Sequence, residues 1–485
     1  MPRRLAIIGP DGTFTYPELE EAAQRAASVL LAGRDDLEEA RVAFMVTPGG
    51  AYAASQRGIW RAGGVAVPLA LSHPEAELAY VIEDSGATIA VADPAHARTL
   101  APVASAAGIR FVTTDQMSGA SIGDLPQHLG ATRRAMIIYT SGTTGRPKGV
   151  VSTHATIGAQ ISALVEAWEW VPSDRLLLTL PMHHVHGIIN GLGSALAVRA
   201  TCEIRPFQPE VVWDRLSSGE ITVFTAVPTM YHRLIASWEA ATAGEQRRRS
   251  EGARRLRLMM SGSAALPVHM LERWREITGH TLLERYGMTE IGMALSNPLH
   301  GERRAGFVGN PLPGVDVQVV DEVAQPVVNG TPGELEVRGP SVFREYWRRT
   351  EETERTFRDG WFRTGDVAVH ENGAYRLLGR TSVDIIKTGG YKVSALEIEE
   401  VLRAHPAIAE CAVVGIADPE WGERVALAVE LKPGASVSLE DLQTWAKPQL
   451  APYKVPRALR SVETLPRNAM GKVLKPDVAA LFTAG

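Results

Sequence analysis

The sequence predicts an α/β fold with a large N-terminal domain of parallel sheets, a small β module and a small α+β C-terminal domain. Strand-like and helix-like segments alternate over most of the 485 residues, as in parallel sheets whose two faces are covered by helices. Near residue 314 the pattern changes to short strands between Gly, Pro and Asn turns. A chain of this length is too long for one ordinary core. We therefore expect an N-terminal domain at 1–380 and a C-terminal domain at 381–485.

Local signals place the elements of the N-terminal domain. Thr15 and Glu18 have the spacing of a capping box, and Pro17 suits the first turn of a helix that begins there. Apolar runs predict strands at 41–46, 65–69, 88–92, 109–113, 176–180, 202–204, 223–227 and 256–260. Helical periodicity predicts helices at 52–62, 75–83, 154–169, 187–198, 209–216, 229–238 and 267–277.

The later elements are shorter and more varied. The β module is predicted from strands at 315–320, 333–338 and 374–378. In the C-terminal domain, helices are predicted at 395–402 and 439–449, and strands at 408–414 and 424–431. A polar tail follows them.

Composition and charge exclude several classes of protein. A formal net charge of −5 implies no general affinity for nucleic acid or anionic membranes, and a solvated helix end or loop explains the basic run at 246–249. The sequence contains no run of about 18 apolar residues, which would span a membrane. Cys202 and Cys411 have apolar neighbours, so we expect buried packing residues rather than a disulfide or a cysteine metal site. The stretch before the first strand is too short for a signal peptide, so we expect a cytoplasmic, reducing setting.

A loop rich in glycine and hydroxyl side chains follows the apolar run at 135–138. It reads YTSGTTGRPKG over 139–149. Its glycines let backbone N–H groups approach an anion, its hydroxyls add donors, and Lys148 adds a positive charge. These residues are Thr140, Ser141, Gly142, Thr143, Thr144, Gly145 and Gly149. Their order is not that of the common P-loop, but the combination predicts a polyphosphate site.

Three further segments suit the other parts of a nucleotide. In RYGMTE, at a strand end, Tyr286 can stack on a purine, Thr289 can bind an α-phosphate and Glu290 can hold Mg²⁺ through oxygen. The carboxylate of Asp366, in RTGD at a turn, suits the ribose hydroxyls, and Arg380 follows it in the sequence. Small residues at the end of another strand, which let a flat base lie against the backbone, are Gly262, Ser263 and Ala264.

Taken together with Lys472, which follows a glycine in the tail segment RNAMGK, these motifs resemble the acyl-activating (adenylate-forming) superfamily. That superfamily contains acyl-CoA synthetases, peptide-synthetase adenylation domains and luciferases, and the resemblance covers essentially the whole chain. It implies an enzyme that uses ATP, Mg²⁺ and coenzyme A. A carboxylate attacks the α-phosphate of ATP, pyrophosphate leaves, and the resulting acyl-AMP passes its acyl group to the CoA thiol.

The resemblance also assigns roles to residues. The Gly-rich loop is expected to hold the β- and γ-phosphates, with Glu290 and Thr144 on Mg²⁺, while Lys472 neutralises charge that develops between carboxylate and α-phosphate. The C-terminal domain is expected to be mobile, withdrawing Lys472 and presenting the 387–393 segment to CoA. Further residues implied are Arg285, Gly287 and Met288 beside the nucleotide, His184 as a gating residue, and Lys387, Gly389 and Gly390 in the CoA segment.

The family pattern leaves two candidates for the hinge. In the family the hinge lies two residues after the arginine, which here is Ser382. This chain has an acidic residue at Asp384 instead, and the stretch from Arg380 to Gly389 is one residue longer than in many relatives. Either residue is therefore a candidate pivot.

The residues around the acyl site indicate which acid is bound. PMHHVHG at 181–187 supplies His184 and His186, Arg285 directly precedes the YGMTE motif, and Arg233 opens a helix that we expect to face the pocket. A buried, unpaired cation is costly beside a fatty acid. A dicarboxylate removes this cost, because its second carboxylate pairs with a guanidinium. The arrangement resembles malonyl-CoA synthetases, so we expect malonate, with methylmalonate as a further substrate.

Several alternatives stay open at this point. Arg285 could form a salt bridge with a neighbouring acid such as Glu284, Arg233 could be an exposed helix residue, and the three histidines could be imagined as a zinc site. The acid could be a short-chain or aromatic monocarboxylate, the acceptor could be a carrier protein, or the protein could be an inactive nucleotide sensor. The expected partners are small-molecule substrates, with a protein acetyltransferase acting on Lys472 as a further candidate.

Overall fold

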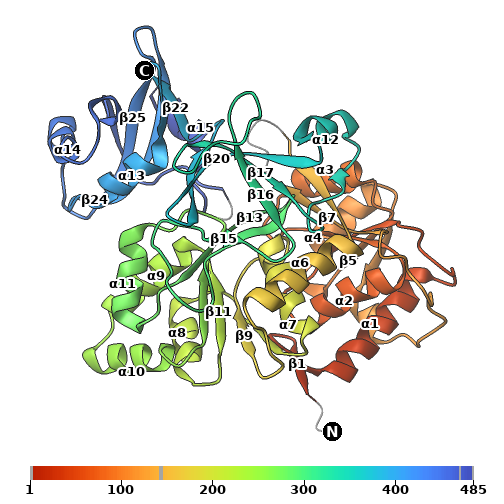
Figure 1. Ribbon diagram of the computed structural model, residues 1–485. Helices are drawn as coiled ribbons and strands as arrows, with labels where there is room; N and C mark the ends of the chain where they lie inside the picture. Colours follow the sequence, from red (N-terminus) through yellow and green to blue (C-terminus); the bar gives the residue numbers. More distant parts are fainter. Residues whose placement is uncertain (1–3, 141–145, 469–470, 483–485) are drawn as a thin grey trace.

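The computed structural model describes residues 4–140, 146–468 and 471–482 (Figure 1). Within these residues the strands form two large sheets, a smaller sheet in the β module and another in the C-terminal part. Helices cover the large sheets, and the C-terminal sheet with its helices stands apart at the upper left of Figure 1. The predicted α/β class is confirmed.

The first large sheet carries most of the candidate site. Its order is β15 (Asn310–Pro311), β14 (Gly292–Ser296), β13 (Leu283–Met288), β12 (Leu258–Ser261), β11 (Val223–Ala226), β9 (Arg175–Leu178), β10 (Thr201–Ile204), β1 (Leu5–Gly9) and β2 (Gly12–Thr15). The strands from β13 to β1 pair in parallel, and the pairings at the two edges are antiparallel.

The second large sheet contains the strands on either side of the Gly-rich loop. Its order is β18 (Glu345–Tyr346), β8 (Lys148–Thr153), β7 (Arg134–Thr140), β4 (Val65–Pro68), β3 (Arg41–Met45), β5 (Ile89–Ala92) and β6 (Arg110–Thr113). From β7 to β6 the pairs are parallel, whereas β8 runs antiparallel to β7. The loop therefore joins two neighbouring antiparallel strands, β7 and β8. The sequence did not predict β8.

The helices of the N-terminal part largely follow the predicted order. They are α1 (Tyr16–Leu31), α2 (Gly50–Arg61), α3 (Glu75–Ser85), α4 (Pro94–Ala106), α5 (Thr114–Ser118), α6 (His154–Ala167), the π-helical η1 (His186–Gly193), α7 (Ser194–Ala197), α8 (Pro209–Ser217), α9 (Pro228–Glu239), α10 (Ala243–Ala253), α11 (Val268–Thr278) and α12 (Thr350–Thr356). The capping box predicted at Thr15 and Glu18 is confirmed at the start of α1. The basic run at 246–249 lies inside α10, which was not predicted.

The β module and the C-terminal part have separate sheets. The module joins β16 (Asp316–Val320), β17 (Gly333–Arg338), β20 (Trp361–Glu371), β19 (Phe357–Arg358) and β21 (Ala374–Arg380). The C-terminal sheet joins β23 (Tyr391–Ser394), β22 (Ile385–Thr388), β25 (Gly422–Leu431), β24 (Ile408–Asp418) and β26 (Ala458–Val462), with α13 (Ala395–Arg403), α14 (Leu439–Ala446), η2 (Pro452–Lys454) and α15 (Lys475–Ala480). The boundary predicted at 380/381 falls between β21 and β22.

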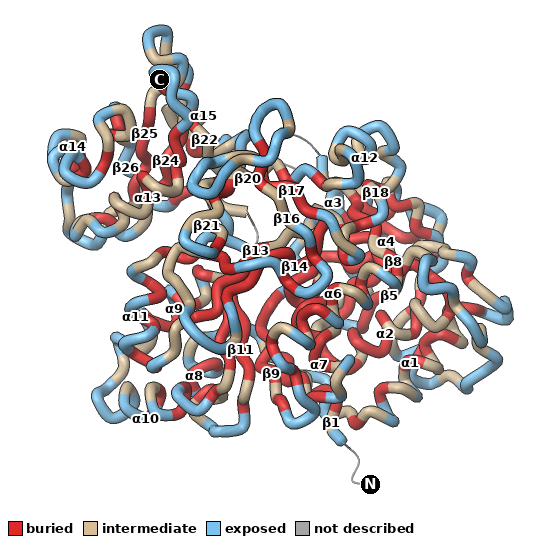
Figure 2. The backbone as a smooth tube through the Cα atoms, viewed as in Figure 1, coloured by how far each residue is buried: buried red, intermediate tan, exposed pale blue. Residues whose placement is uncertain are grey.

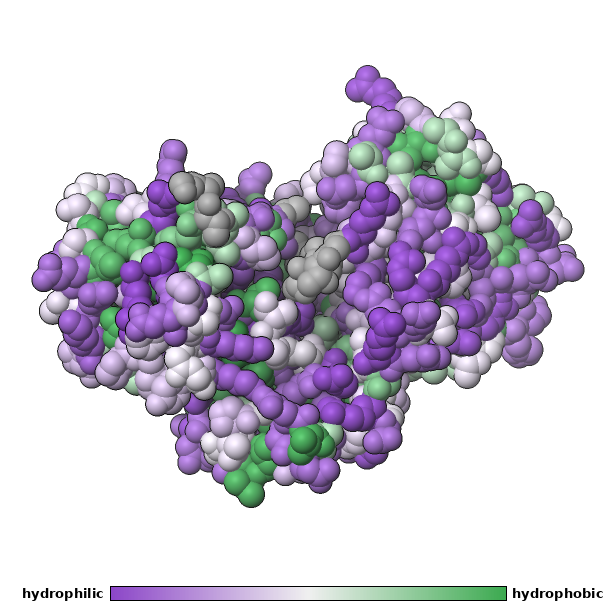
Figure 3. All heavy atoms as spheres, turned by 90° about the horizontal axis from the view of Figure 1, so that it is seen from above, coloured by the Kyte–Doolittle hydropathy of each residue, from purple (hydrophilic) through white to green (hydrophobic). Residues whose placement is uncertain are grey.

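Burial is greatest in the strands of the large sheets, as the red segments of Figure 2 show. One core cluster joins side chains of both large sheets, and the C-terminal part has its own clusters. Cys202 and Cys411 are both free and buried, as expected. Seen from above, hydrophilic side chains separate the apolar groups on the surface (Figure 3). Among the described residues, no helix is both long enough and apolar enough to cross a membrane.

Candidate active site

The candidate residues gather where strands of the two large sheets end. Thr140 closes β7, Gly262 follows β12, and Thr289 follows β13. In open α/β sheets, ligands bind outside the carboxyl ends of parallel strands. The fold therefore brings the phosphate-loop, base and YGMTE motifs to one region. Five residues of the predicted phosphate loop, Ser141, Gly142, Thr143, Thr144 and Gly145, lie outside the described residues.

Asp366 is the centre of a buried polar cluster. Its carboxylate accepts hydrogen bonds from the Tyr286 hydroxyl at 2.6 Å and from Arg380 Nε at 2.9 Å. Burial lowers the pKa of the Arg380 guanidinium, but the nearby Asp366 carboxylate raises it by more, so the pKa of Arg380 is raised overall. The aromatic ring expected to stack on a purine thus lies beside the carboxylate expected to bind ribose.

The local backbone at Asp366 differs from the prediction. We expected a turn, but RTGD lies inside the long strand β20. Pairing with β17 shifts register between Glu334 and Glu336, which face Val367 and Arg363 respectively, so the residues between them bulge. Gly365 within the bulge has a φ of +72°, a conformation that favours glycine. The bulge re-aims the Asp366 side chain toward the site.

Glu290 forms a second buried centre. Its carboxylate is only 6% exposed and accepts a hydrogen bond from the Tyr346 hydroxyl at 2.8 Å. Burial raises the pKa of the Glu290 carboxyl, which the Tyr346 hydrogen bond opposes. Lys148 lies over the Tyr346 ring, 5.4 Å from its centroid, and forms an ion pair with Glu352. A single carboxylate beside phosphate-binding groups is a typical protein contribution to a Mg²⁺ site.

Arg285 and His186, two residues expected to line the acid pocket, belong to a short polar chain built on three strand ends. Arg285 is 3% exposed, and its Nη2 donates hydrogen bonds to Nε2 of His186 and, at 3.4 Å, to Thr225 Oγ1. Because arginine can only donate, His186 Nε2 is an acceptor and Nδ1 carries the proton. His186 Nδ1 then donates to Ser263 Oγ at 3.0 Å. Burial, followed by the nearby Arg285 charge, lowers the pKa of His186 well below its usual value, so the ring is neutral.

The guanidinium of Arg285 has no anionic partner among the described residues. Its Nε and Nη1 atoms are buried without a hydrogen-bond partner. Burial lowers its pKa to about 10, which still leaves it charged at neutral pH. The salt bridge to Glu284 that we considered is not formed, since Glu284 instead accepts from the Leu266 N–H at 3.3 Å. Burial raises the pKa of Glu284 to about 8, so this carboxyl is mostly protonated.

His184 lies beside this pocket but contacts other groups. Its ring is 4.0 Å from that of His183, and its Nε2 is buried without a hydrogen-bond partner among the described residues. Burial lowers the pKa of His184 to about 4 and that of His183 to about 3. Both rings are therefore neutral near pH 7. No cluster of three or more metal-ligating side chains occurs in the described part of the chain, so the imagined zinc site is not supported.

Arg233 does not face the pocket as we expected. It is exposed, and its guanidinium lies over the Phe207 ring, 5.0 Å from the centroid. The buried residues of α9 are Pro228, Tyr231, Leu234 and Ile235. Arg233 thus projects from the opposite side of the helix. It is an exposed helix arginine, the alternative named from the sequence.

The tail lysine approaches the site from the C-terminal part. Lys472 is exposed, in a tight turn in which its N–H donates to Asn468 Oδ1 at 3.0 Å. The adjacent Gly471 packs near Thr229 at the start of α9, so that an added Cβ would lie 3.6 Å from Thr229 Oγ1. The loop that carries Lys472 therefore contacts the N-terminal part beside the carboxyl end of β11.

The segment expected to meet CoA lies elsewhere on the C-terminal part. Gly389 and Gly390 form the two-residue turn between β22 and β23, both with positive φ. Lys387 and both glycines are exposed, and Gly389 packs against the Trp421 ring. Among the residues that the structure describes, none of the three contacts the nucleotide motifs.

The two candidate hinge residues differ in their contacts. The Asp384 carboxylate accepts from the Arg380 N–H at 3.0 Å and lies 3.5 Å from Lys475 Nζ. Ser382 is exposed. Asp384 therefore contacts both parts, through Arg380 and through Lys475, whereas Ser382 lies between Arg380 and Asp384 in the sequence.

Sequence reasoning missed four residues of the site. Thr225 contacts both His186 and Arg285, Tyr346 orients Glu290, Trp168 lies 5.9 Å from Arg285, and Glu400 contacts α11 from the C-terminal part. Only Thr225 carried a local signal, as a polar residue in an otherwise apolar strand. The other three reach the site through tertiary contacts.

This two-part fold, with its nucleotide motifs at the strand ends, defines an adenylate-forming enzyme. Residues 1–347 match the AMP-binding enzyme family and residues 397–472 match the AMP-binding enzyme C-terminal domain, so the chain belongs to this family. The predicted family is thereby confirmed.

Named relatives narrow the comparison. The chain is 45% identical to mitochondrial malonate–CoA ligase ACSF3 of Xenopus laevis, over 99% of this chain and 90% of that protein. It is 36% identical to ATP-bound MatB from Rhodopseudomonas palustris, with a TM-score of 0.92 and coverage of 100% and 96%. Against apo MatB from the same organism the TM-score is 0.81, with the same identity and coverage.

Proposed function

We propose that this protein is an ATP-dependent malonate–CoA ligase. The observation that carries this proposal is the buried guanidinium of Arg285, which has two unpartnered donor atoms and no ion pair with a carboxylate among the described residues. An unpaired buried charge is costly. A dicarboxylate substrate supplies the missing anion at its distal end, while its other carboxylate reacts. The similarity to malonate–CoA ligases over nearly the whole chain supports the same substrate.

In the first step, a malonate carboxylate oxygen attacks the α-phosphorus of ATP. The new O–P bond forms as the bond to the leaving pyrophosphate breaks, which gives malonyl-AMP. Lys472 supplies positive charge where the carboxylate and α-phosphate oxygens meet, as electrostatic stabilisation. Glu290, with Thr144 from the phosphate loop, would hold Mg²⁺, which neutralises charge on the phosphates when bound. Asp366 and Tyr286 would position ribose and base.

Arg285 has a positioning role in this step. A guanidinium attracts a carboxylate through its fixed charge and its N–H donors. Its Nη2 is already held by His186 and Thr225, so Nε and Nη1, which lie on different edges of the guanidinium, remain as single donors for the substrate. A malonate bound in this way presents its free carboxylate at a fixed distance. Methylmalonate has the same pair of carboxylates and is proposed as a further substrate.

In the second step, the CoA thiol loses its proton and its sulfur attacks the malonyl carbonyl carbon. A C–S bond forms and AMP leaves with the carbonyl-to-phosphate oxygen. The hairpin turn at Gly389 and Gly390 has no side chain beyond Cα, which suits close approach of a pantetheine arm. In the observed arrangement this turn is away from the nucleotide motifs, so the second step requires the C-terminal part to rotate.

An acid screen by ATP–pyrophosphate exchange tests the substrate. We expect malonate to give the fastest exchange, methylmalonate a slower one, and acetate, butyrate and benzoate little. Product analysis with CoA as the sole acceptor then separates a CoA ligase from an enzyme that loads a carrier protein. Faster exchange with a monocarboxylate would overturn the choice of acid, and exchange without a thioester product would overturn the choice of acceptor.

Lys472 is also proposed as a site of regulation by a protein acetyltransferase. Its side chain is exposed in the described conformation and hence accessible to a modifying enzyme. Acetylation removes the positive charge, which the first step requires. Chemical acetylation of Lys472 should therefore abolish pyrophosphate exchange while acyl transfer from preformed malonyl-AMP continues; loss of both activities would argue against this mode of control.

A further inference from the structure

Helix α11 of the N-terminal part is capped by a residue of the C-terminal part. The residue before α11 is Pro267, and no neighbouring side chain caps the helix. Instead, the Val268 N–H donates a hydrogen bond to Glu400 Oε1 at 2.9 Å. A carboxylate at this position satisfies an otherwise unpaired backbone donor and interacts favourably with the helix dipole. Glu400 lies in α13, across the boundary between the two parts.

The capped helix begins directly after the segment that approaches the acid pocket. Ser263 in that segment contacts His186, and the Leu266 N–H donates to Glu284. Glu400 therefore docks on the same short stretch of backbone that supports the neutral His186 ring. A second contact across the boundary is the ion pair of Lys392 with Glu322, and a third is the packing of Gly471 near Thr229 described above.

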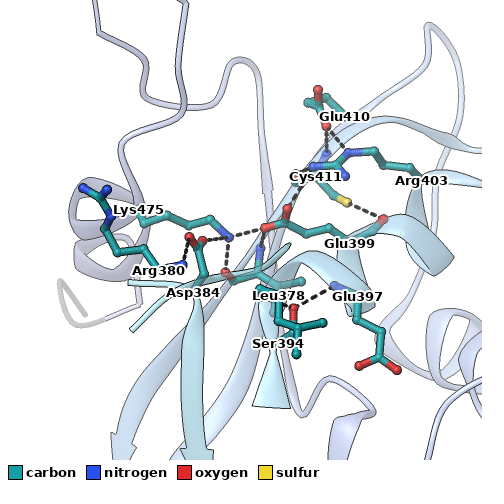
Figure 4. Close-up of polar contacts among 11 residues, drawn as sticks. Leu378, Arg380, Asp384, Ser394, Glu397, Glu399, Arg403, Glu410, Cys411 and Lys475 are labelled. Carbon is teal, nitrogen blue, oxygen red and sulfur yellow. Dashed lines mark hydrogen bonds and ion pairs between the residues drawn. The ribbon is translucent and has the colours of Figure 1, made fainter. Parts of the chain in front are cut away.

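Helix α13 is also fixed to the tail that carries the catalytic lysine. Figure 4 shows Glu399, the neighbour of Glu400, pointing toward Lys475 and Arg403. Arg403 Nη2 donates to Glu399 Oε2 at 2.9 Å, and Lys475 Nζ also donates to the Val413 carbonyl at 2.6 Å. Glu399 is 2% exposed, and burial, opposed by the charges of Lys475 and Arg403, leaves its pKa lowered. Because Lys475 opens α15 directly after the Lys472 turn, a movement of α13 carries Lys472 with it.

We propose that Glu400 is a positioning residue for the adenylation step. Its carboxylate caps α11 when the C-terminal part is oriented as in this structure, with the turn that carries Lys472 against the start of α9, and it thereby favours that orientation. This inference rests on the proposed two-step function. The CoA step uses a rotated C-terminal part, in which the cap is lost, so the contact favours one half-reaction and not the other.

Separate measurement of the two half-reactions tests the proposal. Glu400→Ala is expected to slow malonate-dependent ATP–pyrophosphate exchange by about two- to thirtyfold, the range that loss of a helix cap produces. Glu400→Gln retains a neutral acceptor and should give an intermediate value. Single-turnover transfer from enzyme-bound malonyl-AMP to CoA should be unchanged or faster in both variants. Glu397→Ala is the matched control, because Glu397 lies in the same helix but pairs with Lys454 inside the C-terminal part.

A second readout does not depend on activity. Hydrogen exchange of the backbone amides at the start of α11 should speed up in Glu400→Ala and stay unchanged in Glu397→Ala, in the full-length protein with ATP bound. The proposal would be overturned if Glu400→Ala slowed both half-reactions equally, or if it left the rate of malonate-dependent ATP–pyrophosphate exchange unchanged. Failure of the wild-type protein to exchange pyrophosphate with malonate would instead overturn the proposed substrate.

Discussion

The guanidinium of Arg285 donates to Nε2 of His186 and so fixes the imidazole as the neutral Nδ1–H tautomer. The pair is wholly enclosed, yet two of the arginine's donor atoms have no partner among the described residues. The histidine thus orients the arginine without neutralising it. The remaining donors, Nε and Nη1, are buried on a charged group, and under the proposed function they bind the second carboxylate.

Replacement of Arg285 is the most direct test of this arrangement. Breaking a buried ion pair by removing one partner costs about 3–5 kcal/mol. Arg285→Ala should therefore lower kcat/KM for malonate by on the order of a hundredfold or more, with little change in ATP binding. Steady-state kinetics with malonate and isothermal titration with ATP measure the two effects. Arg233→Ala is the control, since that arginine is exposed and should leave both values unchanged.

A substitution at Gly262 tests the role of Arg285 without changing the arginine itself. A Cβ atom at Gly262 would collide with Arg285 Nη1, while the glycine's own backbone conformation is open to other residues. Gly262→Ala should therefore displace the guanidinium and raise KM for malonate by roughly tenfold. Stability should change much less than substrate binding. An unaltered malonate KM in a folded Gly262→Ala protein would show that Nη1 does not bind substrate.

The carboxylate of Glu290 should determine the requirement for Mg²⁺. Glu290→Gln removes the charge but keeps an acceptor for Tyr346, so the Mg²⁺ concentration for half-maximal pyrophosphate exchange should rise by about tenfold or more. Titration of MgCl₂ at fixed ATP provides the measurement. Glu351→Gln, at an exposed position in α12, serves as a control of equal charge change. Identical Mg²⁺ dependence in both variants would remove Glu290 from the metal site.

Glu284 should make the folded protein less stable as pH rises. Burial raises the folded-state pKa to about 8, above the ordinary value of 4.5. Between these values the folded state retains a proton that the unfolded state has released, so stability falls with increasing pH through this window. Glu284→Gln removes this effect and should stabilise the protein by about 3 kcal/mol at pH 7.

Denaturation of both proteins at pH 5 and pH 7.5 checks the sign. The two stabilities should be close at pH 5 and should diverge at pH 7.5, with the variant more stable. A wild-type protein that is as stable as Glu284→Gln at pH 7.5 would show that Glu284 ionises normally.

Local signals in the sequence were enough to predict much of the fold. The capping box at Thr15, the strand before the phosphate loop and the alternation of strands and helices depend on neighbours in the chain, and the structure contains all of them. Helix α10 was missed because its residues are mostly polar, although it packs on α8. The strand β8 was not predicted because its first residues, Lys148 and Gly149, belong to the loop motif and only two apolar residues, Val150 and Val151, follow them.

The site was predictable where a motif carries the chemistry and not where tertiary contacts do. Asp366 and Tyr286 come together as the motifs imply. The orientation of Arg233 could have been inferred, since Tyr231, Leu234 and Ile235 have the spacing of one buried face and Arg233 falls outside it. In contrast, nothing near Glu290 in the sequence indicates Tyr346, which arrives from a strand of the other large sheet.

The double attachment of Lys475 limits how the reaction can be ordered. Its contacts with Glu399 and Asp384 join the tail, α13 and the first residues after β21 into one body, to which the Gly389–Gly390 hairpin also belongs through β25. A pivot at Ser382 would keep the Lys475 contacts and break the hydrogen bond from the Arg380 N–H to Asp384. Since Lys472 and the hairpin belong to the same part of the chain, a rotation that brings the hairpin to the substrate also moves Lys472. Under the proposed function, the CoA thiol therefore reaches the acyl group only after adenylation, when Lys472 has moved away. The movement of the C-terminal part thus sets the order of the two steps and keeps CoA from the acid before it is activated.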